Sequence, residues 1–87
     1  MATEVIMPQM GLDIREGRVV RWLKQEGETV NQGEAIAEVE TDKAIIEIDA
    51  FASGVLRRID IGENEMVAVG VVIGIIADPG EELPELP

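Results

Sequence analysis

The sequence contains no cysteine and no histidine, and its only aromatic residues are Trp22 and Phe51. The missing cysteine excludes disulfides, thiolate metal sites and cysteine nucleophiles, and the missing histidine removes the usual general base. We therefore expect no metal site, no catalytic residue and no enzymatic activity in a chain of 87 residues. The core must be built from Val, Ile, Leu and Ala, and Trp22 and Phe51 are expected to pack in it or along sheet edges.

Basic side chains are also scarce, with 7 Lys and Arg against 18 Asp and Glu and a net charge of −11. Nucleic acids and anionic membranes repel such a chain, so neither is an expected partner, whereas basic surfaces of proteins attract it. The longest uncharged run, residues 66–77, is shorter than the roughly 20 residues of a membrane-spanning helix. With no export signal at the N-terminus and no cysteine, a cytoplasmic location is expected.

The sequence has short runs of Val and Ile separated by Gly or Asn, and no stretch repeats apolar residues with a sustained helical period. This pattern is typical of strands joined by turns. It predicts strands near residues 3–7, 18–24, 35–40, 44–49, 54–60 and 71–77, with short extra pairings near 29–30 and 66–67.

An internal repeat aligns residues 17–39 with residues 54–76 without a gap. Seven positions are identical, namely Gly17/Gly54, Arg21/Arg58, Glu26/Glu63, Glu28/Glu65, Val30/Val67, Gly33/Gly70 and Ile36/Ile73. One half alone would leave its sheet edges and one apolar face open to water, whereas two halves can bury a common core. The repeat predicts an all-β fold, a flattened barrel or sandwich with pseudo-two-fold symmetry.

The two repeats join through a segment that alternates apolar and polar residues around Asp42 and Lys43. If these two form the turn of a hairpin, the facing pairs are Thr41–Ala44, Glu40–Ile45, Val39–Ile46, Glu38–Glu47 and Ala37–Ile48. Val39–Ile46 and Ala37–Ile48 then share a core face, and Glu38–Glu47 lies on the solvated face. Asp-Lys does not favour positive φ, so a type I turn is expected, with Lys43 pointing into solvent.

The chain ends in a segment rich in Pro and Glu, which cannot continue a sheet because Pro lacks a backbone donor. We therefore divide the chain into a folded domain over residues 1–79 and the start of an interdomain linker over residues 80–87.

Several spaced motifs resemble the lipoyl domains of the dihydrolipoamide acyltransferases, which belong to 2-oxo acid dehydrogenase complexes. They are Glu40-Thr41-Asp42-Lys43-Ala44, Met7-Pro8-Gln9-Met10-Gly11 with Glu16-Gly17, and the run from Trp22 to Val30. The resemblance covers about residues 3–78. It implies two four-stranded antiparallel sheets, with both termini far from the lysine turn, and a monomeric isolated domain.

The resemblance further implies that Lys43 carries lipoate in amide linkage. A thiamine-diphosphate-dependent 2-oxo acid dehydrogenase would reductively acylate it, with pyruvate the best match and branched-chain 2-oxo acids next. An acyltransferase domain, absent from this sequence, would pass the acyl group to coenzyme A, and a flavin-dependent dihydrolipoamide dehydrogenase would reoxidise the arm. A lipoyl ligase and the first enzyme would read Glu40, Thr41, Asp42 and Ala44.

The resemblance also implies that the loop of residues 9–15 lies beside the lysine turn and helps to select the partner enzyme. Leu12 and Ile14 are its candidate recognition residues, partly exposed, with core packing as the alternative for both. Asp13 and Arg15 stand where relatives often have uncharged residues.

Three other functions are compatible with such a fold. Biotin carriers typically flank their lysine with Met, whereas Asp42 and Ala44 flank Lys43 here. Glycine-cleavage carrier proteins are longer and have extra helix. Unmodified lipoyl-like modules with a structural role lack an intact lysine hairpin.

Overall fold

The repeat and the hairpin are both present in the computed structural model, which describes residues 2–9 and 11–83. Eight strands follow one another along these residues. They are β1 (Thr3–Ile6), β2 (Glu16–Trp22), β3 (Thr29–Val30), β4 (Ala35–Glu40), β5 (Ile45–Asp49), β6 (Gly54–Ile59), β7 (Met66–Ala68) and β8 (Val72–Ala77). Each lies within a few residues of a strand expected from the sequence. No helix that could cross a membrane occurs in this part of the chain.

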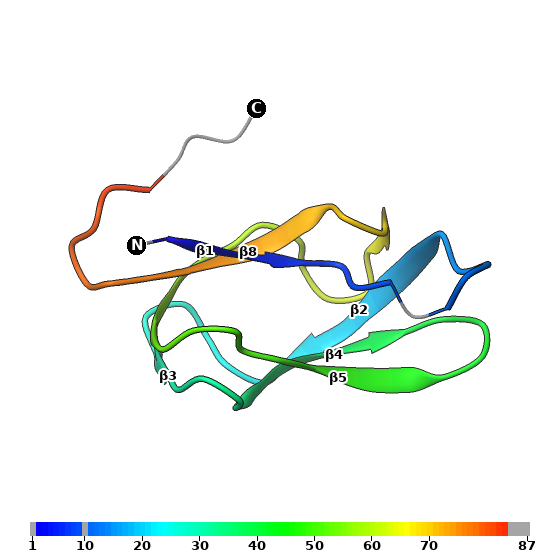
Figure 1. Cartoon of the computed structure of the whole chain (residues 1–87), viewed down its shortest axis with the longest axis horizontal. Coiled ribbons are helices and arrows are strands. Elements are labelled where there is room, and N and C mark those ends of the chain that lie inside the picture. Colours follow the sequence, from blue (N-terminus) through cyan, green and yellow to red (C-terminus); the bar gives the residue numbers. More distant parts are fainter. Residues whose placement is uncertain (1, 10, 84–87) are drawn as a thin grey trace.

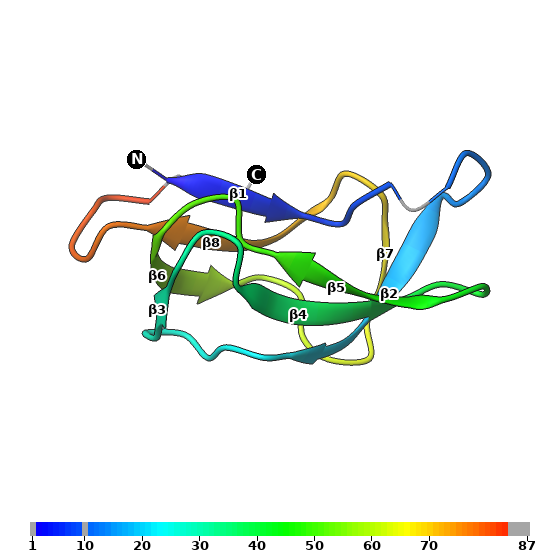
Figure 2. The ribbon, with the colours of Figure 1, turned by 60° about the horizontal axis from the view of Figure 1, so that its bottom comes forward.

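The strands form two four-stranded sheets, in the orders β1-β8-β6-β3 and β5-β4-β2-β7, and every pairing is antiparallel (Figures 1 and 2). The all-β fold with two four-stranded sheets is therefore confirmed. Replacing β2, β3, β4 and β5 by β6, β7, β8 and β1 converts one strand order into the other. This exchange is the predicted pseudo-two-fold symmetry, and it shows that each sheet contains strands from both repeats.

Hydrogen bonds between the halves follow the same symmetry. The amide of Val19 donates to the carbonyl of Glu65 at 3.0 Å, and the amide of Leu56, its repeat equivalent, donates to the carbonyl of Glu28 at 3.0 Å. The acids that the repeat places in both turns also bond across the halves. Glu26 accepts from the amide of Ile59 at 2.7 Å, and Glu63 accepts from the amide of Trp22 at 3.3 Å.

Aliphatic side chains from both sheets fill the space between them, as the composition required. The largest fully buried ones are Met7, Ile36, Leu56, Ile73, Ile75, Ile76, Val19, Val30 and Val39. Trp22 packs against this core and donates from Nε1 to the carbonyl of Ile61 at 2.9 Å. Phe51, in contrast, is 76% exposed and lies outside the core, beside β1 and the end of β5, with which it lines a shallow hollow. It follows the end of β5, where the chain leaves the sheet.

The β4–β5 hairpin projects at one end of the long axis, opposite the start of β1 and the last described residues (Figure 1). The molecule measures 38 Å along this axis. Residues 79–83 contain no strand, whereas residues 84–87 of the expected linker lie outside the described part of the chain. The fold therefore presents the hairpin turn at the end of the molecule away from the start of β1 and from residues 79–83 (Figure 1).

A lysine hairpin as the candidate functional site

The hairpin has the register expected from the alternation of its residues. The paired positions are Ala37–Ile48, Glu38–Glu47, Val39–Ile46 and Glu40–Ile45. Ala37 and Val39 are fully buried and Ile48 is 8% exposed, so one face of the ribbon anchors it to the core. Because both hydrogen bonding between the strands and burial of one face hold the ribbon, the turn at its end has a fixed position on the molecule.

The turn itself contains Asp42 and Lys43, and neither has positive φ. Types I′, II′ and II are thereby excluded, in agreement with the expected type I turn. Thr41 braces it, because its Oγ1 accepts from the amides of Lys43 at 3.1 Å and Ala44 at 3.2 Å. The amide of Thr41 also donates to the carbonyl of Ala44 at 2.8 Å. The hydroxyl thus accepts the hydrogen bonds that a backbone carbonyl would otherwise accept in the turn.

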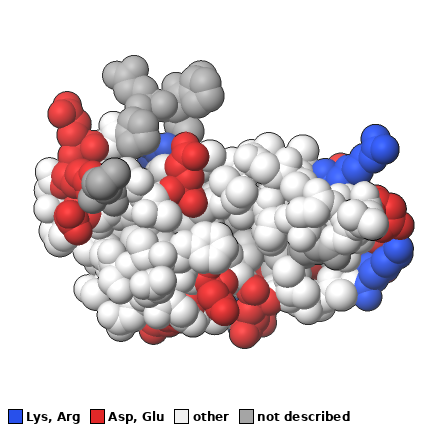
Figure 3. All heavy atoms as spheres, in the orientation of Figure 1, with Lys and Arg blue, Asp and Glu red and all other residues white. Residues whose placement is uncertain are grey.

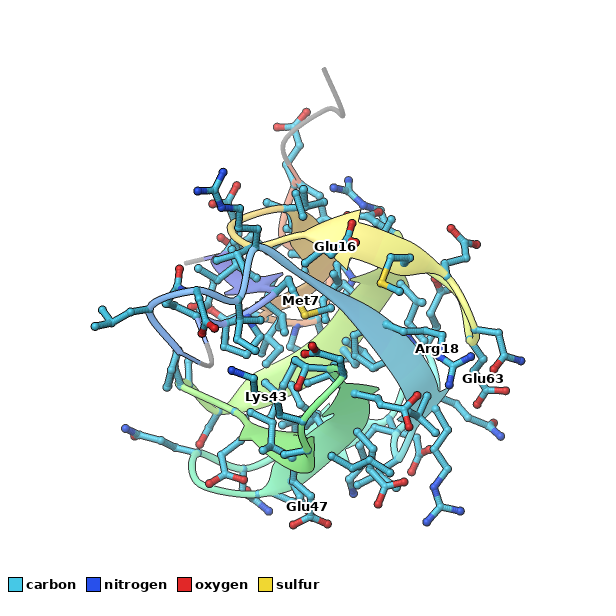
Figure 4. All side chains as sticks on the ribbon, turned by 90° about the vertical axis from the view of Figure 1, so that its right-hand side faces the viewer. Met7, Glu16, Arg18, Lys43, Glu47 and Glu63 are labelled. Atoms are coloured by element: carbon cyan, nitrogen blue, oxygen red, sulfur yellow. The ribbon has the colours of Figure 1, made fainter. Side chains whose placement is uncertain are left out.

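Lys43 extends from this turn towards the loop that follows β1 (Figure 4). Its Nζ lies 2.9 Å from Oδ2 of Asp13, and the two side chains are 61% and 73% exposed. The other lysine, Lys24, is only 21% exposed and pairs with Glu34 at 3.1 Å. Lys43 is therefore the more accessible of the chain's two lysine amines.

The loop between β1 and β2 is folded back on itself. The side-chain amide of Gln9 donates to the carbonyls of Gly11 and Ile14, the latter at 2.8 Å, and the amide of Ile14 donates to the carbonyl of Gly11 at 3.2 Å. These bonds turn Ile14 inward, where it is 7% exposed, and leave Leu12 fully exposed. Of the two alternatives left open by the sequence, exposure therefore holds for Leu12 and core packing for Ile14.

An open groove of about 490 Å³ lies between this loop, the start of β2 and the turn. Charged side chains dominate its walls, and Arg18 on β2 forms an ion pair with Glu40 on β4. Basic and acidic groups meet at this end of the molecule, and further acidic groups lie at the opposite end and along the lower edge of the visible face (Figure 3). The Arg18–Glu40 pair ties the hairpin to the neighbouring strand.

The structure gathers most of the predicted site residues at one tip. Glu40 is the last residue of β4, and the turn that follows contains Thr41, Asp42, Lys43 and Ala44. Leu12 lies on the adjacent loop. Ile14 lies beneath that loop. The contact of Asp13 with Lys43 was not expected from the sequence, although an acidic residue in the loop expected beside the lysine turn was a signal for it.

This arrangement suits a covalent attachment point better than a catalytic centre. The Lys43 amine is exposed, and the small Ala44 beside it is exposed as well. A long acyl chain on Nζ would therefore extend into solvent without a clash. Within the described residues no group of three acidic side chains is arranged to hold a metal ion.

Comparisons with known proteins agree with this geometry. Residues 3–76 match the family described as "Biotin-requiring enzyme", the biotin and lipoyl attachment domains. The solution structure of the lipoyl domain of the 2-oxoglutarate dehydrogenase complex from Azotobacter vinelandii superposes with a TM-score of 0.72. It is 33% identical, and the match covers 86% of this chain and 95% of that domain.

Acetyltransferase components of larger assemblies are similar in sequence. The dihydrolipoyllysine-residue acetyltransferase component of the pyruvate dehydrogenase complex from Rickettsia prowazekii is 40% identical over 87 residues, 99% of this chain. The corresponding component of the acetoin cleaving system from Pseudomonas putida is 41% identical over 80 residues, 92% of this chain. The chain spans about a fifth of the length of these relatives, 21% and 22%.

The family match, the shared fold and the relatives all concern a module that bears its prosthetic group on a lysine. The matched structure is a lipoyl domain and the matched sequences are dihydrolipoyllysine proteins, which distinguishes lipoate from biotin. The chain belongs to the biotin and lipoyl attachment family and is a lipoyl domain, a carrier whose family bears lipoate covalently on a lysine.

Proposed function

We propose that Lys43 is the lipoylated residue and that this domain is the carrier of an acyltransferase serving a pyruvate dehydrogenase. One observation supports the choice of lysine above all. Lys43 stands at the outermost point of a braced hairpin, whereas Lys24 is largely covered and paired with Glu34. The relatives whose names specify the pyruvate dehydrogenase complex support the choice of substrate.

Different residues hold Lys43 in place and contact the partner enzymes. Thr41 holds the turn, Val39 and Ala37 anchor the ribbon, and the exposed side chains of Asp42 and Leu12 are available to partner enzymes. Lipoate supplies, when bound, a dithiolane that carries acyl groups and electron pairs between active sites. A carrier needs no general base of its own.

A carrier of this kind has several partners. We infer a lipoyl ligase that modifies Lys43, a thiamine-diphosphate-dependent dehydrogenase, an acyltransferase catalytic domain and a flavin-dependent dihydrolipoamide dehydrogenase. A tether that joins the carrier to such enzymes makes each visit intramolecular and raises its effective concentration. Acyl transfer to coenzyme A would reside in the part of the protein outside this chain.

Intact mass spectrometry after co-expression with a lipoyl ligase and lipoate tests the attachment site. We expect one lipoyl group on the wild-type domain and on Lys24→Ala, and none on Lys43→Ala. Modification that persists in Lys43→Ala, or biotin on the wild-type domain, contradicts the proposal.

The substrate is tested separately with lipoylated domain and purified dehydrogenases specific for pyruvate, 2-oxoglutarate or branched-chain 2-oxo acids. We expect the highest kcat/KM for reductive acylation with the pyruvate enzyme. A higher value with another enzyme would keep the carrier role and reassign the complex.

A further inference from the structure

The ion pair between Asp13 and Lys43 is placed so that modification of the lysine must break it. The two residues lie 30 positions apart in the chain, yet Nζ and Oδ2 are 2.9 Å apart. We propose that lipoylation releases Asp13, and that the released carboxylate binds a basic group of the dehydrogenase, so that recognition reports the modified state. This proposal rests on the proposed function of Lys43 as the lipoylated residue.

The chemistry of attachment removes the cation that Asp13 contacts. The Lys43 amine attacks the carbonyl carbon of an activated lipoate, a mixed anhydride or thioester. The Nζ–C bond forms, the bond from that carbon to the activating group breaks, and the leaving group takes its electron pair. The ammonium gives up two protons in all, and the amide product is neutral. An amide nitrogen no longer attracts a carboxylate as an ammonium does.

Asp13 keeps its position after this change because its loop is anchored independently of Lys43. Ile14 is buried, and the Gln9 side chain bonds the carbonyls on either side of Asp13. The carbonyl of Arg15 accepts from the amide of Val69 at 2.9 Å. The loop therefore continues to display Asp13 next to the turn when its cation is gone.

The charge that appears is local to the tip. Glu40 remains paired with Arg18, so the other carboxylates of this groove are those of Asp13, Glu16 and Asp42, and of these only Asp13 loses its cation on modification. An exposed ion pair is weak, so the ligase can open it at little cost. Charges at the rim of an interface act mainly on association and its salt dependence. The partner chemistry is thus an arginine or lysine at the mouth of the dehydrogenase site, beside an apolar surface that receives Leu12.

Two substitutions of Lys43 separate the loss of charge from the presence of the arm. Lys43→Gln is neutral, as the lipoylated residue is, whereas Lys43→Arg keeps the cation and can keep the pair with Asp13. Both unlipoylated variants are titrated as competitive inhibitors of the reductive acylation of lipoylated wild-type domain. We expect Lys43→Gln to inhibit about threefold more strongly than Lys43→Arg, a difference of about 0.7 kcal/mol, which is the size of a weak exposed ion pair. The advantage should fall as salt is raised.

The same pair of substitutions is then made in an Asp13→Asn background, with Asp49→Asn as the matched control. Asp49 is exposed on β5 and changes the net charge equally. The advantage of glutamine over arginine should disappear with Asp13→Asn and persist with Asp49→Asn. Equal inhibition in the wild-type background, or an advantage that survives Asp13→Asn, overturns the proposal.

A measurement on the domain alone complements the kinetics. The NMR shift of the Asp13 side-chain carboxyl carbon is compared before and after lipoylation, with Asp49 as internal control. We expect a change at Asp13 that is reproduced by Lys43→Gln and absent at Asp49. If mass spectrometry shows no lipoyl group on Lys43, the proposed function fails first. If Lys43 is lipoylated and Asp13 does not respond, only the present proposal fails.

Discussion

The hydroxyl of Thr41 offers a sharp test of how the tip is held. Thr41→Val keeps the shape and β-branching of the side chain but removes the acceptor of the Lys43 and Ala44 amides. A net hydrogen bond contributes about 0.5–1.5 kcal/mol. Both amides lie at the exposed tip, where water can replace the hydroxyl, so the lower end of that range applies to each bond. We expect a total loss of about 1 kcal/mol in the free energy of unfolding.

For a domain of this size, about 1 kcal/mol lowers Tm by roughly 4–8 °C. Calorimetry measures that shift, and amide ¹⁵N relaxation measures the order of the turn. We expect the order parameter at Lys43 to fall from about 0.85 towards about 0.6 in Thr41→Val. Thr41→Ser retains the hydroxyl and should lose less than half as much stability. An unchanged order parameter in Thr41→Val, or equal losses in both variants, would refute the role of the hydroxyl.

Three further predictions concern the frame behind the tip. Leu56→Ala should cost about 2–5 kcal/mol because Leu56 is fully buried, whereas Phe51→Ala should stay within about 0.5 kcal/mol, and chemical denaturation compares them. Gly74→Ala should cost about 1–3 kcal/mol, since an added Cβ would meet Trp22 Cη2 at 2.9 Å and the Arg58 carbonyl oxygen at 3.0 Å; an unchanged Tm would contradict this packing. The backbone amide of Asn31, and then Lys24, lower the pKa of Glu34 below its ordinary value of 4.5. Wild-type protein should therefore be more stable than Glu34→Gln above pH 4.5, and this difference should vanish as the pH falls through the lowered pKa.

Much of the fold could be predicted because two constraints in the sequence reinforce each other. The alternation from Ala37 to Ile48 permits one register that buries Val39 and turns Glu38 to the opposite face, and a two-residue turn then has to fall at Asp42 and Lys43. The repeat indicated that β2, β3 and β4 have β6, β7 and β8 as their symmetric partners. Local pattern and repeat spacing thus carry enough information to place strands, sheets and the projecting lysine.

The details that could not be predicted depend on how loops fold against other elements. Ile14 turns inward because its loop is held by hydrogen bonds from Gln9. The two residues lie in a loop, where no periodic pattern of the sequence predicts burial. Phe51 is exposed because the chain leaves the sheet just before it, which its hydrophobicity does not reveal. The pair of Asp13 with Lys43 joins a loop and a turn whose separation is set only by the assembled sheets.

The exchange of strands between the two halves bears on the order of events during synthesis. The hairpin of Lys43 belongs to the first half, but the core against which Val39 and Ala37 pack includes Leu56, Ile73 and Ile76 of the second. A nascent chain that has emerged only to residue 50 therefore lacks the part of the core that the second half supplies behind its own lysine turn. Non-local contacts of this kind form late. If Lys43 is the attachment site, as proposed, an enzyme that requires the rigid turn would modify folded domains and not unfinished ones, so that attachment of the arm would follow folding.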